Sequence, residues 1–457
     1  MPRNKSLGLD LTEGSVVRQM VLYALPMMLA TALQQVYSLV DTIVVGQMLG
    51  SAGLSSVAVA SQLIGFMTFL CIGFSGGAQI IISQYTGAKR FDELRSIIGN
   101  TFLVHAISAL FFTLIGIVFC RPLLNLLNAP PEAFEGAVDY LIISSIGLIF
   151  VYGYNCICAI LRGMGDSSRP LVFIVISSII NIVLDILFVG PLKMGAAGAA
   201  LATIISQAVA FAVAIAYLYQ RREAFHFDFK LKSFLPVKDV LGKICRQGLP
   251  QAIQMAAINV SIMFIHANVN SFGVAASAAF SVGSKIEHIP SIATQGFSNA
   301  VAAMVGQNFA AGKFDRIRKT TNVALVVSVV VLSIAAAVYL LFPETMFRLF
   351  TQDESVIALA ATVLACMTIA YPANAMMNSY RGVVLGVGNA GLNLVLGIFD
   401  GVVLRVGLAY LLGTVLEMGL PGFIIGYSAA AYGMGVPCMI YYLSGAWKRR
   451  KSLVGKG

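Results

Sequence analysis

Acidic side chains inside apolar segments are the residues of this sequence best suited to bind and release an ion. One segment reads SIINIVLDILF, and in it Asn181 precedes Asp185 by four residues, which places both on one face of a helix. Asp41 lies in a second segment, QQVYSLVDTIVVG. A charge at the middle of a bilayer costs roughly 2.5–3.5 kcal/mol, so each carboxylate is a candidate functional group.

Further polar residues in apolar segments can complete a site around these carboxylates. Carboxylate, amide and hydroxyl oxygens together can replace the hydration shell of a small cation, since hard cations prefer oxygen ligands. The same carboxylates can instead share a proton, which relieves the repulsion between two like charges. The predicted ligands of Na⁺ or H⁺ are Asp41, Asn181, Asp185 and Thr203, and the predicted substrate-binding or supporting residues are Tyr37, Asn155, Ser178 and Glu287.

An internal repeat sets the acidic cluster apart from the rest of the chain. At a shift of 223 residues the two halves share Gln, Asn, Phe-Asp and Gly-x-Gly positions, whereas Asp185 falls on Leu408 and Asn181 on Leu404. Thr203 falls on Gly426 at the same shift. A residue needed only for the scaffold would occur in both halves, so the cluster is interpreted as a functional site.

The C-terminal half carries a different set of charged residues. Lys285 and Glu287 lie in VGSKIEHIPS, and Asp400 and Arg405 lie in GIFDGVVLRVG. Residues two apart on a helix do not face each other, so Lys285 and Glu287 are not expected to pair. Neutralising ion pairs between spans and a substrate site both fit this set, and Glu287 is the predicted substrate contact.

One pattern suggests an enzyme. The sequence GFSG around Ser75 has the form seen in intramembrane serine proteases, which need a histidine within hydrogen-bond reach of the serine. His105, His266 and His288 lie in differently placed segments and form no triad pattern. Small residues in a membrane span usually allow close helix packing. We therefore predict that the protein is not an enzyme.

The composition predicts an integral membrane protein. Of 457 residues, 58% are hydrophobic and 11% are charged, against about a quarter charged in soluble domains. A bilayer core takes about 20 apolar residues per helix, and twelve such runs can be identified. They are approximately 17–46, 53–85, 95–120, 136–161, 169–190, 195–219, 240–271, 275–308, 319–342, 355–385, 390–416 and 422–446.

The distribution of basic residues predicts the orientation. With both termini on one side, the segments on that side hold 25 of the 30 Lys and Arg residues, and the opposite loops hold 3. Cytoplasmic loops carry the excess of Lys and Arg, so both termini are expected in the cytoplasm of a cell with this protein in its inner (plasma) membrane. The net charge of +10 then reflects topology and not nucleic-acid binding.

The repeat predicts the architecture. Each copy holds six spans, so the copies have the same orientation and are expected to form two parallel-repeat six-helix bundles around a central cleft. The expected lobes are residues 1–223 and 224–457, the second beginning with a linker that is interpreted as a solvated connector. Pro26 in the first span matches Pro250, and a proline within a helix removes a backbone hydrogen bond and kinks it.

These features together resemble the bacterial and archaeal branches of the multidrug and toxic-compound extrusion (MATE) family. The resemblance covers the whole chain and is carried by VDTIVVGQMLG, the GAKRFDEL loop and LRGMGDSSRP. It implies that a cation site in the N-terminal lobe couples the inward flow of Na⁺ or H⁺ to drug export. The residues that match the family's cation site and first-helix bend are Asp41, Asn181, Asp185, Thr203 and Pro26. A second acidic site that some relatives place in spans seven and ten has no match here.

The expected function is that of a secondary active transporter that exports organic, often cationic, compounds in exchange for H⁺ or Na⁺. The alternative is a flippase of lipid-linked oligosaccharides from the same superfamily, although a pyrophosphate substrate would favour basic residues in the cleft. A channel is a further alternative, but two kinked repeats around a one-sided acidic site favour alternating access.

The expected partners are small amphiphilic or cationic drugs and membrane lipids. No Walker lysine follows the glycine-rich stretches, so an ion gradient is the expected energy source. No nucleic acid, resident cofactor or resident metal is expected, and the protein is expected to act as a monomer.

Overall fold

The computed structural model describes residues 8–455, which are largely helical and contain no β-strand. Their contacts divide the chain into two compact units. Unit 1 comprises residues 8–10 and Leu25–Ala252, and unit 2 comprises Leu11–Ala24 and residues 253–455. The linker and the beginning of the seventh span therefore pack with unit 1. The predicted lobes, divided after residue 223, describe the repeat and stay a prediction.

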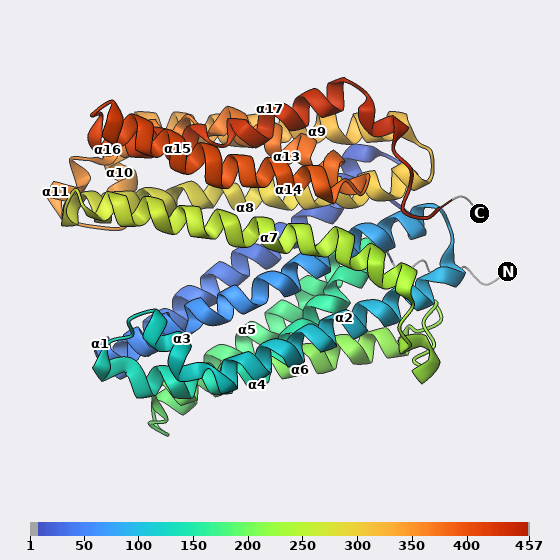
Figure 1. The fold of residues 1–457 in the computed structure, drawn as a ribbon, viewed down its shortest axis with the longest axis horizontal. Coiled ribbons are helices and arrows are strands. Elements are labelled where there is room, and N and C mark those ends of the chain that lie inside the picture. Colours follow the sequence, from blue (N-terminus) through green and yellow to red (C-terminus); the bar gives the residue numbers. More distant parts are fainter. Residues whose placement is uncertain (1–7, 456–457) are drawn as a thin grey trace. The chain divides into compact units, whose positions relative to one another are not determined.

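The helices of unit 1 run alongside one another and reverse direction from span to span (Figure 1). They are α1 (Val16–Gly87, in this unit from Leu25), α2 (Phe91–Val118), α3 (Cys120–Leu126), α4 (Pro131–Gly163), α5 (Ser168–Val189), α6 (Gly195–Gln220), the 3₁₀-helix η1 (Leu231–Phe234) and the beginning of α7 (Lys238–Asn270).

Unit 2 has more interruptions within its helices. It contains the rest of α7, α8 (Val274–Ala310), α9 (Phe314–Leu341), α10 (Pro343–Arg348), α11 (Glu354–Ile357), α12 (Ala360–Thr368), α13 (Tyr371–Gly386), α14 (Ala390–Ile398), the π-helix η2 (Phe399–Leu404), α15 (Arg405–Tyr410), the π-helix η3 (Leu411–Val415), α16 (Gly419–Ala429), α17 (Tyr432–Leu443) and the 3₁₀-helix η4 (Ala446–Arg449).

The predicted spans are confirmed as helical segments. Helix α1 covers the first two runs, and they are separated at Gly50, where φ is 66° and only glycine is unstrained. Ten of the described helices are long and apolar enough to cross a membrane, and α8 is less apolar than these because it is rich in Ala, Gly and Ser. The all-helical fold with twelve spans makes this a multi-pass membrane protein.

Each unit is organised around its fourth span. In unit 1, α4 packs against α2 and α6, and α5 packs against α6. In unit 2, α13 packs against α8, α9 and α17. More of the apolar stretch in these two central spans is buried than in most of the others, so the core of each unit lies around them.

Matching close contacts confirm the repeat in three dimensions. A β-carbon on Gly163 would lie 2.8 Å from Cβ of Ile82, and one on Gly386 would lie 2.6 Å from Cβ of Val305. Both residues of the second contact lie 223 positions after those of the first. The two glycines therefore serve the same purpose, close approach of the fourth and second spans of each half.

The repeated Phe-Asp motif has a packing role in each unit. Phe91 stacks on His226 with ring centroids 4.8 Å apart, and Phe314 meets Trp447 edge-on at 5.7 Å. His226 follows the sixth span of its half, and Trp447 follows the twelfth span. In each unit the phenylalanine thus fastens the chain that leaves the bundle to the start of the third span of that half.

The register of the repeat changes within the eleventh span. Positive φ angles recur at Lys193 and Glu417 and at Gly195 and Gly419, which are 224 residues apart. The six-residue π-helix η2 accommodates the additional residue, since each of its hydrogen bonds spans five residues instead of four. The shift of 223 is therefore wrong beyond η2, and a comparison of the halves must use 224 there.

The linker differs from the prediction of a solvated connector. Phe225 and Phe227 are fully buried, and Asp228 accepts a hydrogen bond from Ser233 at 2.5 Å and pairs with Arg95 at 3.1 Å. The alternation of aromatic and polar residues in this segment reflects one side packed on α2 and α6 and one side facing outward.

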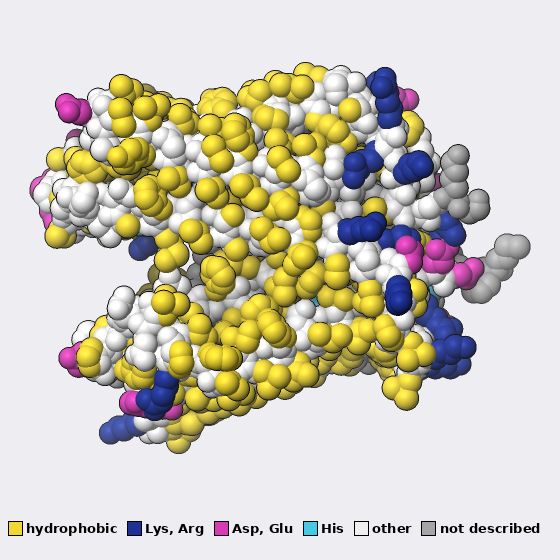
Figure 2. All heavy atoms as spheres, in the orientation of Figure 1, with side chains coloured by type: hydrophobic (Ala, Val, Ile, Leu, Met, Phe, Trp, Pro, Cys, Tyr) yellow, Lys and Arg dark blue, Asp and Glu magenta, His cyan; other side chains and the backbone are white. Residues whose placement is uncertain are grey.

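Charge is distributed unevenly along unit 2. Figure 2 shows that most Lys and Arg side chains of this unit lie toward the end where the chain terminates, and that Asp and Glu side chains gather at the opposite end. This polarity follows the asymmetry of the loops in the sequence, because basic residues of this unit lie at the start of α9 and in the C-terminal segment.

Candidate ion-binding site

A buried stripe on α5 carries the polar pair identified in the sequence. Its members recur every three or four residues, and they are Pro170, Phe173, Ser177, Asn181, Asp185 and Val189. Asp185 is 0% exposed and Asn181 is 1% exposed. Ser178 is half-buried beside the stripe, next to the buried Ser177.

The structure brings Asp41 of α1 to Asp185 of α5. The two carboxyl groups interact directly, and Tyr37, one turn before Asp41, interacts with both. Among the described residues, neither carboxyl group has an ion pair with Lys, Arg or His. Unit 1 thus contains two buried or half-buried acids without a basic partner.

Several polar atoms of this pair are buried without hydrogen bonds. Asp41 Oδ1, both carboxylate oxygens of Asp185 and both amide atoms of Asn181 have no hydrogen-bond partner among the described residues. An unsatisfied buried polar group costs about 1–3 kcal/mol, so such groups are uncommon unless something else binds them. Carboxylate and amide oxygens fit a hard cation or a proton.

The remaining predicted residues of unit 1 have looser relations to the pair. Thr203 is half-buried on α6, which packs against α5, and its hydroxyl forms no hydrogen bond within the described chain. Asn155 is half-buried on α4 and donates to the carbonyl of Val151 in its own helix at 2.8 Å. Asn155 is therefore satisfied locally and is not brought to the carboxyl pair.

One member of the cluster was missed in the sequence. Tyr140 of α4 is buried and interacts with both carboxyl groups and with Ser61. At a shift of 223 it falls on Val363, so a residue-by-residue comparison of the two halves would have marked it as polar in one half only.

The two prolines lie where the chain passes between units. The boundaries fall between Ala24 and Leu25 in α1 and between Ala252 and Ile253 in α7, each within two residues of Pro26 or Pro250. A proline within a helix leaves one carbonyl without its donor, which makes bending easier at that point.

The repeat partners of the site must be corrected for the register of η2. At a shift of 224, Asn181 falls on Arg405 and not on Leu404, and Thr203 falls on Tyr427 and not on Gly426. Asp185 falls on Ala409, which is likewise 0% exposed. The second half still lacks the acidic pair, and it has a basic residue in place of Asn181.

The predicted substrate residue Glu287 lies in unit 2, apart from the carboxyl pair of unit 1. It is half-buried on α8 and interacts with Arg405, Tyr339, Tyr371 and Tyr427. Lys285 is exposed, as expected for a residue two positions away that does not face Glu287.

The expectation that no histidine reaches Ser75 was wrong. Ser75 Oγ lies 3.0 Å from Nε2 of His105, and His105 Nδ1 lies 2.8 Å from the carbonyl oxygen of Thr101. Both side chains are buried, and the third partner is a backbone carbonyl where a protease has an acid. The contact links α1 to α2 as a polar helix–helix hydrogen bond.

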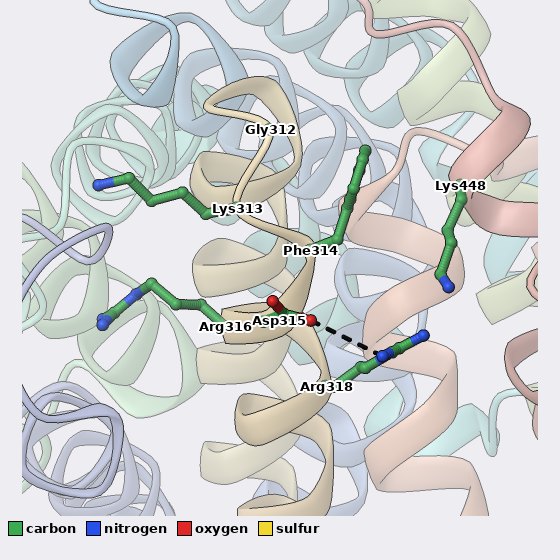
Figure 3. A pocket seen from close by; sticks show the side chains of 7 residues that line it. All are labelled: Gly312, Lys313, Phe314, Asp315, Arg316, Arg318 and Lys448. Atoms are coloured by element: carbon green, nitrogen blue, oxygen red, sulfur yellow. Dashed lines mark ion pairs between the residues drawn. The ribbon is translucent and has the colours of Figure 1, made fainter.

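A cavity of about 480 Å³ lies elsewhere, at the start of α9 (Figure 3). It is lined by Gly312, Lys313, Phe314, Asp315, Arg316, Arg318 and Lys448. Lys313 and Arg316 donate to backbone carbonyls of residues 11–14 at 2.7–3.2 Å, and Arg318 pairs with Asp315 at 3.7 Å. These basic groups hold the segment before α1 and do not form the predicted ion site.

Comparison with known proteins is consistent with this architecture. The sequence model of the MatE family matches residues 26–187 and 250–411, and both ends are 224 residues apart (250 − 26 and 411 − 187). The probable multidrug resistance protein YpnP of Bacillus subtilis is 29% identical over 448 residues, covering 98% of this chain and 99% of that protein. The multidrug export protein MepA of Staphylococcus haemolyticus is 24% identical over 396 residues, 86% of each.

Solved structures share the fold. One described as the outward-facing conformation of a multidrug resistance MATE family transporter of the MOP superfamily superposes with a TM-score of 0.90. It is 23% identical in sequence, and the alignment covers 98% of this chain and 99% of that chain.

Proposed function

The chain belongs to the MatE family, whose members are transporters and not enzymes, and we propose that it is a secondary antiporter that exports organic, often cationic, compounds in exchange for H⁺ or Na⁺. The observation that carries this proposal is the pair Asp41 and Asp185, buried together without a basic partner. Relatives named as multidrug resistance and multidrug export proteins support the substrate class.

The carboxyl pair supplies the coupling. When both groups are ionised they repel each other, and a proton or a Na⁺ held with Asn181 and Thr203 removes that repulsion. The first helix then bends near Pro26, and the affinity for the exported compound changes. The ion must bind the two conformations with different affinities, because only a difference in affinity shifts an equilibrium. The same coupling makes the compound lower the affinity for the ion.

Dye transport in inside-out vesicles tests the proposal. A fluorescent cationic dye should accumulate while a pH or Na⁺ gradient is present, and collapse of the coupling gradient should stop accumulation. Asp185→Asn should behave like vesicles without the protein, because an amide cannot exchange a cation charge. Asp139→Asn, which changes an exposed acid on α4, is the matched control and should retain transport. Accumulation after both gradients are collapsed would contradict ion coupling.

The proposed location is the inner (plasma) membrane with both termini in the cytoplasm, supported by the asymmetry of Lys and Arg between loops. Cysteines introduced at Gly87 and Gly312 in a cysteine-free protein should react only with cytoplasmic reagent. A cysteine at Ala129 should react only from outside. Labelling of positions 87 and 312 from opposite sides would contradict parallel repeats.

The flippase of lipid-linked oligosaccharides is the alternative outcome. A pyrophosphate group favours several Arg or Lys contacts, whereas the carboxyl pair of unit 1 has no basic partner among the described residues. Translocation of such a lipid by vesicles that do not accumulate dye would favour the flippase. A single monomer is proposed to suffice, because the carboxyl cluster is complete within one chain.

A further inference from the structure

The cluster around Arg405 in unit 2 has the composition of a cation-binding site that already contains a cation. Cζ of Arg405 lies 5.0 Å from the centre of the Tyr427 ring, and Glu287 interacts with both residues. A guanidinium over an aromatic ring is a cation–π contact, the interaction by which aromatic groups bind quaternary ammonium ligands. Tyr339 and Tyr371 stand beside Glu287, with ring centroids 6.4 Å apart.

The guanidinium of Arg405 is only weakly fixed. Its Nη2 lies 3.6 Å from Oδ2 of Asp400, which is longer than a hydrogen bond. Arg405 Nε and Asp400 Oδ1 are buried and have no hydrogen-bond partner within the described chain, and the same holds for the hydroxyl of Tyr371. Such groups are usually satisfied, so the cluster has capacity for a further polar or charged ligand.

The π-helix decides which acid Arg405 can reach. Asp400 and Arg405 are five residues apart, which on an α-helix would place them about 140° apart around the axis. In the π-helix η2 the hydrogen bonds span five residues, so positions i and i+5 come close to one another. Arg405 can therefore contact Asp400 while it also lies over Tyr427 and near Glu287.

The corrected repeat gives the same cluster a functional meaning. Arg405 stands at the position of Asn181, and Tyr427 stands at the position of Thr203, two of the proposed cation ligands of unit 1. Unit 2 thus has a covalently attached cation at the place where unit 1 is proposed to bind an exchangeable one.

We propose that Glu287 and the tyrosines around it form a subsite for an organic ammonium or phosphonium ion, and that Arg405 is the internal cation that such a substrate displaces toward Asp400. This inference rests on the proposed export of organic cations and assigns part of the recognition to unit 2. Asp400 acts as a positioning residue, since it stabilises Arg405 in the displaced state. Glu287 and Tyr427 contact the substrate.

Equilibrium binding of tetraphenylphosphonium to the purified full-length protein, without any gradient, tests the proposal. Glu287→Gln should weaken binding at least about tenfold, while binding of the uncharged triphenylphosphine oxide is unchanged. Arg405→Gln removes the internal competitor and should tighten tetraphenylphosphonium binding about five- to tenfold. Asp400→Asn leaves Arg405 over Tyr427 and should weaken binding about threefold or more.

The double variant separates competition from a structural role. If Asp400 acts only through Arg405, Asp400→Asn combined with Arg405→Gln should bind as tightly as Arg405→Gln alone. Arg318→Gln and Glu344→Gln, at partly and fully exposed positions of unit 2, serve as matched controls. Weaker binding by Arg405→Gln, or equal losses in all three single variants with lower thermal stability, would overturn the proposal.

The result also separates this inference from the proposed function. If the three variants do not follow the expected pattern while dye transport still requires Asp185, only the subsite is wrong. If the unaltered protein does not bind tetraphenylphosphonium at all, the export of organic cations fails together with the subsite.

Discussion

The two units handle buried acids in opposite ways. In unit 1, Asp41 and Asp185 interact with each other and have no basic partner among the described residues. In unit 2, Asp400 and Glu287 both interact with Arg405. An acid pair without a basic residue can bind and release a cation, whereas an acid paired with arginine is neutralised at every pH at which the protein is folded. The comparison explains why an exchangeable ion is proposed only for unit 1.

The same positions of the repeat have taken different tasks. Where unit 1 has the buried Asp185, unit 2 has the buried Ala409, which lies against Gly426 so closely that a β-carbon on that glycine would be 2.3 Å from its backbone nitrogen. Unit 2 therefore uses this place for helix packing. The scaffold was copied, and the chemistry in it was not.

The largest expected effect comes from removing one acid of unit 1. Asp41→Asn and Asp185→Asn should each reduce gradient-driven dye transport to the background, because a single remaining carboxyl group has no partner to repel. The double variant should be no worse than either single one, since interacting residues that act together are not additive. Transport rates at matched expression measure this, and near-normal transport by either variant would remove the pair from the mechanism.

A smaller effect should distinguish the two prolines. Pro26→Ala restores a backbone hydrogen bond in the helix that carries Asp41, so the helix resists bending and transport should fall severalfold. Pro250→Ala affects a helix whose residue at the position of Asp41 is the apolar Ile265, and it should have a weaker effect. Initial rates of dye transport measure both. Equal losses would indicate that bending is not tied to the acid pair.

Stability should respond equally to changes in the copied scaffold. Gly163→Ala and Gly386→Ala each introduce a β-carbon within 3 Å of the neighbouring helix, so each should lower the free energy of unfolding by about 1–3 kcal/mol. Thermal unfolding of the purified variants gives the comparison, with Gly242→Ala as a control where nothing lies within 4 Å. A large loss in only one of the two would show that the units are packed differently.

The smallest effect is expected in the linker, which packs with unit 1. A hydrogen bond from Ser233 lowers the pKa of Asp228, and Lys230 and Arg95 act in the same direction. Because the pKa is lower in the folded state, this interaction stabilises the linker above the ordinary pKa of aspartate, about 4, and is lost as the pH falls through the lowered value.

Limited proteolysis measures this contribution. At pH 7, Asp228→Asn should be cut by chymotrypsin in the linker modestly faster than the unaltered protein. At acidic pH, pepsin should cut both at similar rates, since the unaltered aspartate is then protonated. Asp315→Asn, which changes an exposed acid of unit 2, should have no effect on cleavage of the linker.

Several features required knowledge of which helices are neighbours. The hydrogen bond between Ser75 and His105 joins residues 30 positions apart, and the sequence analysis excluded it because spans alone do not give distances between side chains. Tyr140 was missed for the same reason. The π-helix η2 also could not be predicted, because hydrophobicity does not distinguish hydrogen bonds over four residues from those over five.

The sequence by itself determined the spans, the repeat and the acidic residues that need an explanation, because these depend on local composition and on the number of apolar residues that cross a bilayer. It placed Asp41 and Asp185 in the same half, and their contact was expected. Only the tertiary structure decided that Arg405 stands at the position of Asn181, since one additional residue in η2 changes the register of everything after it. A buried side chain acquires its partners from adjacent helices, and their register is set by backbone hydrogen bonding and packing in three dimensions.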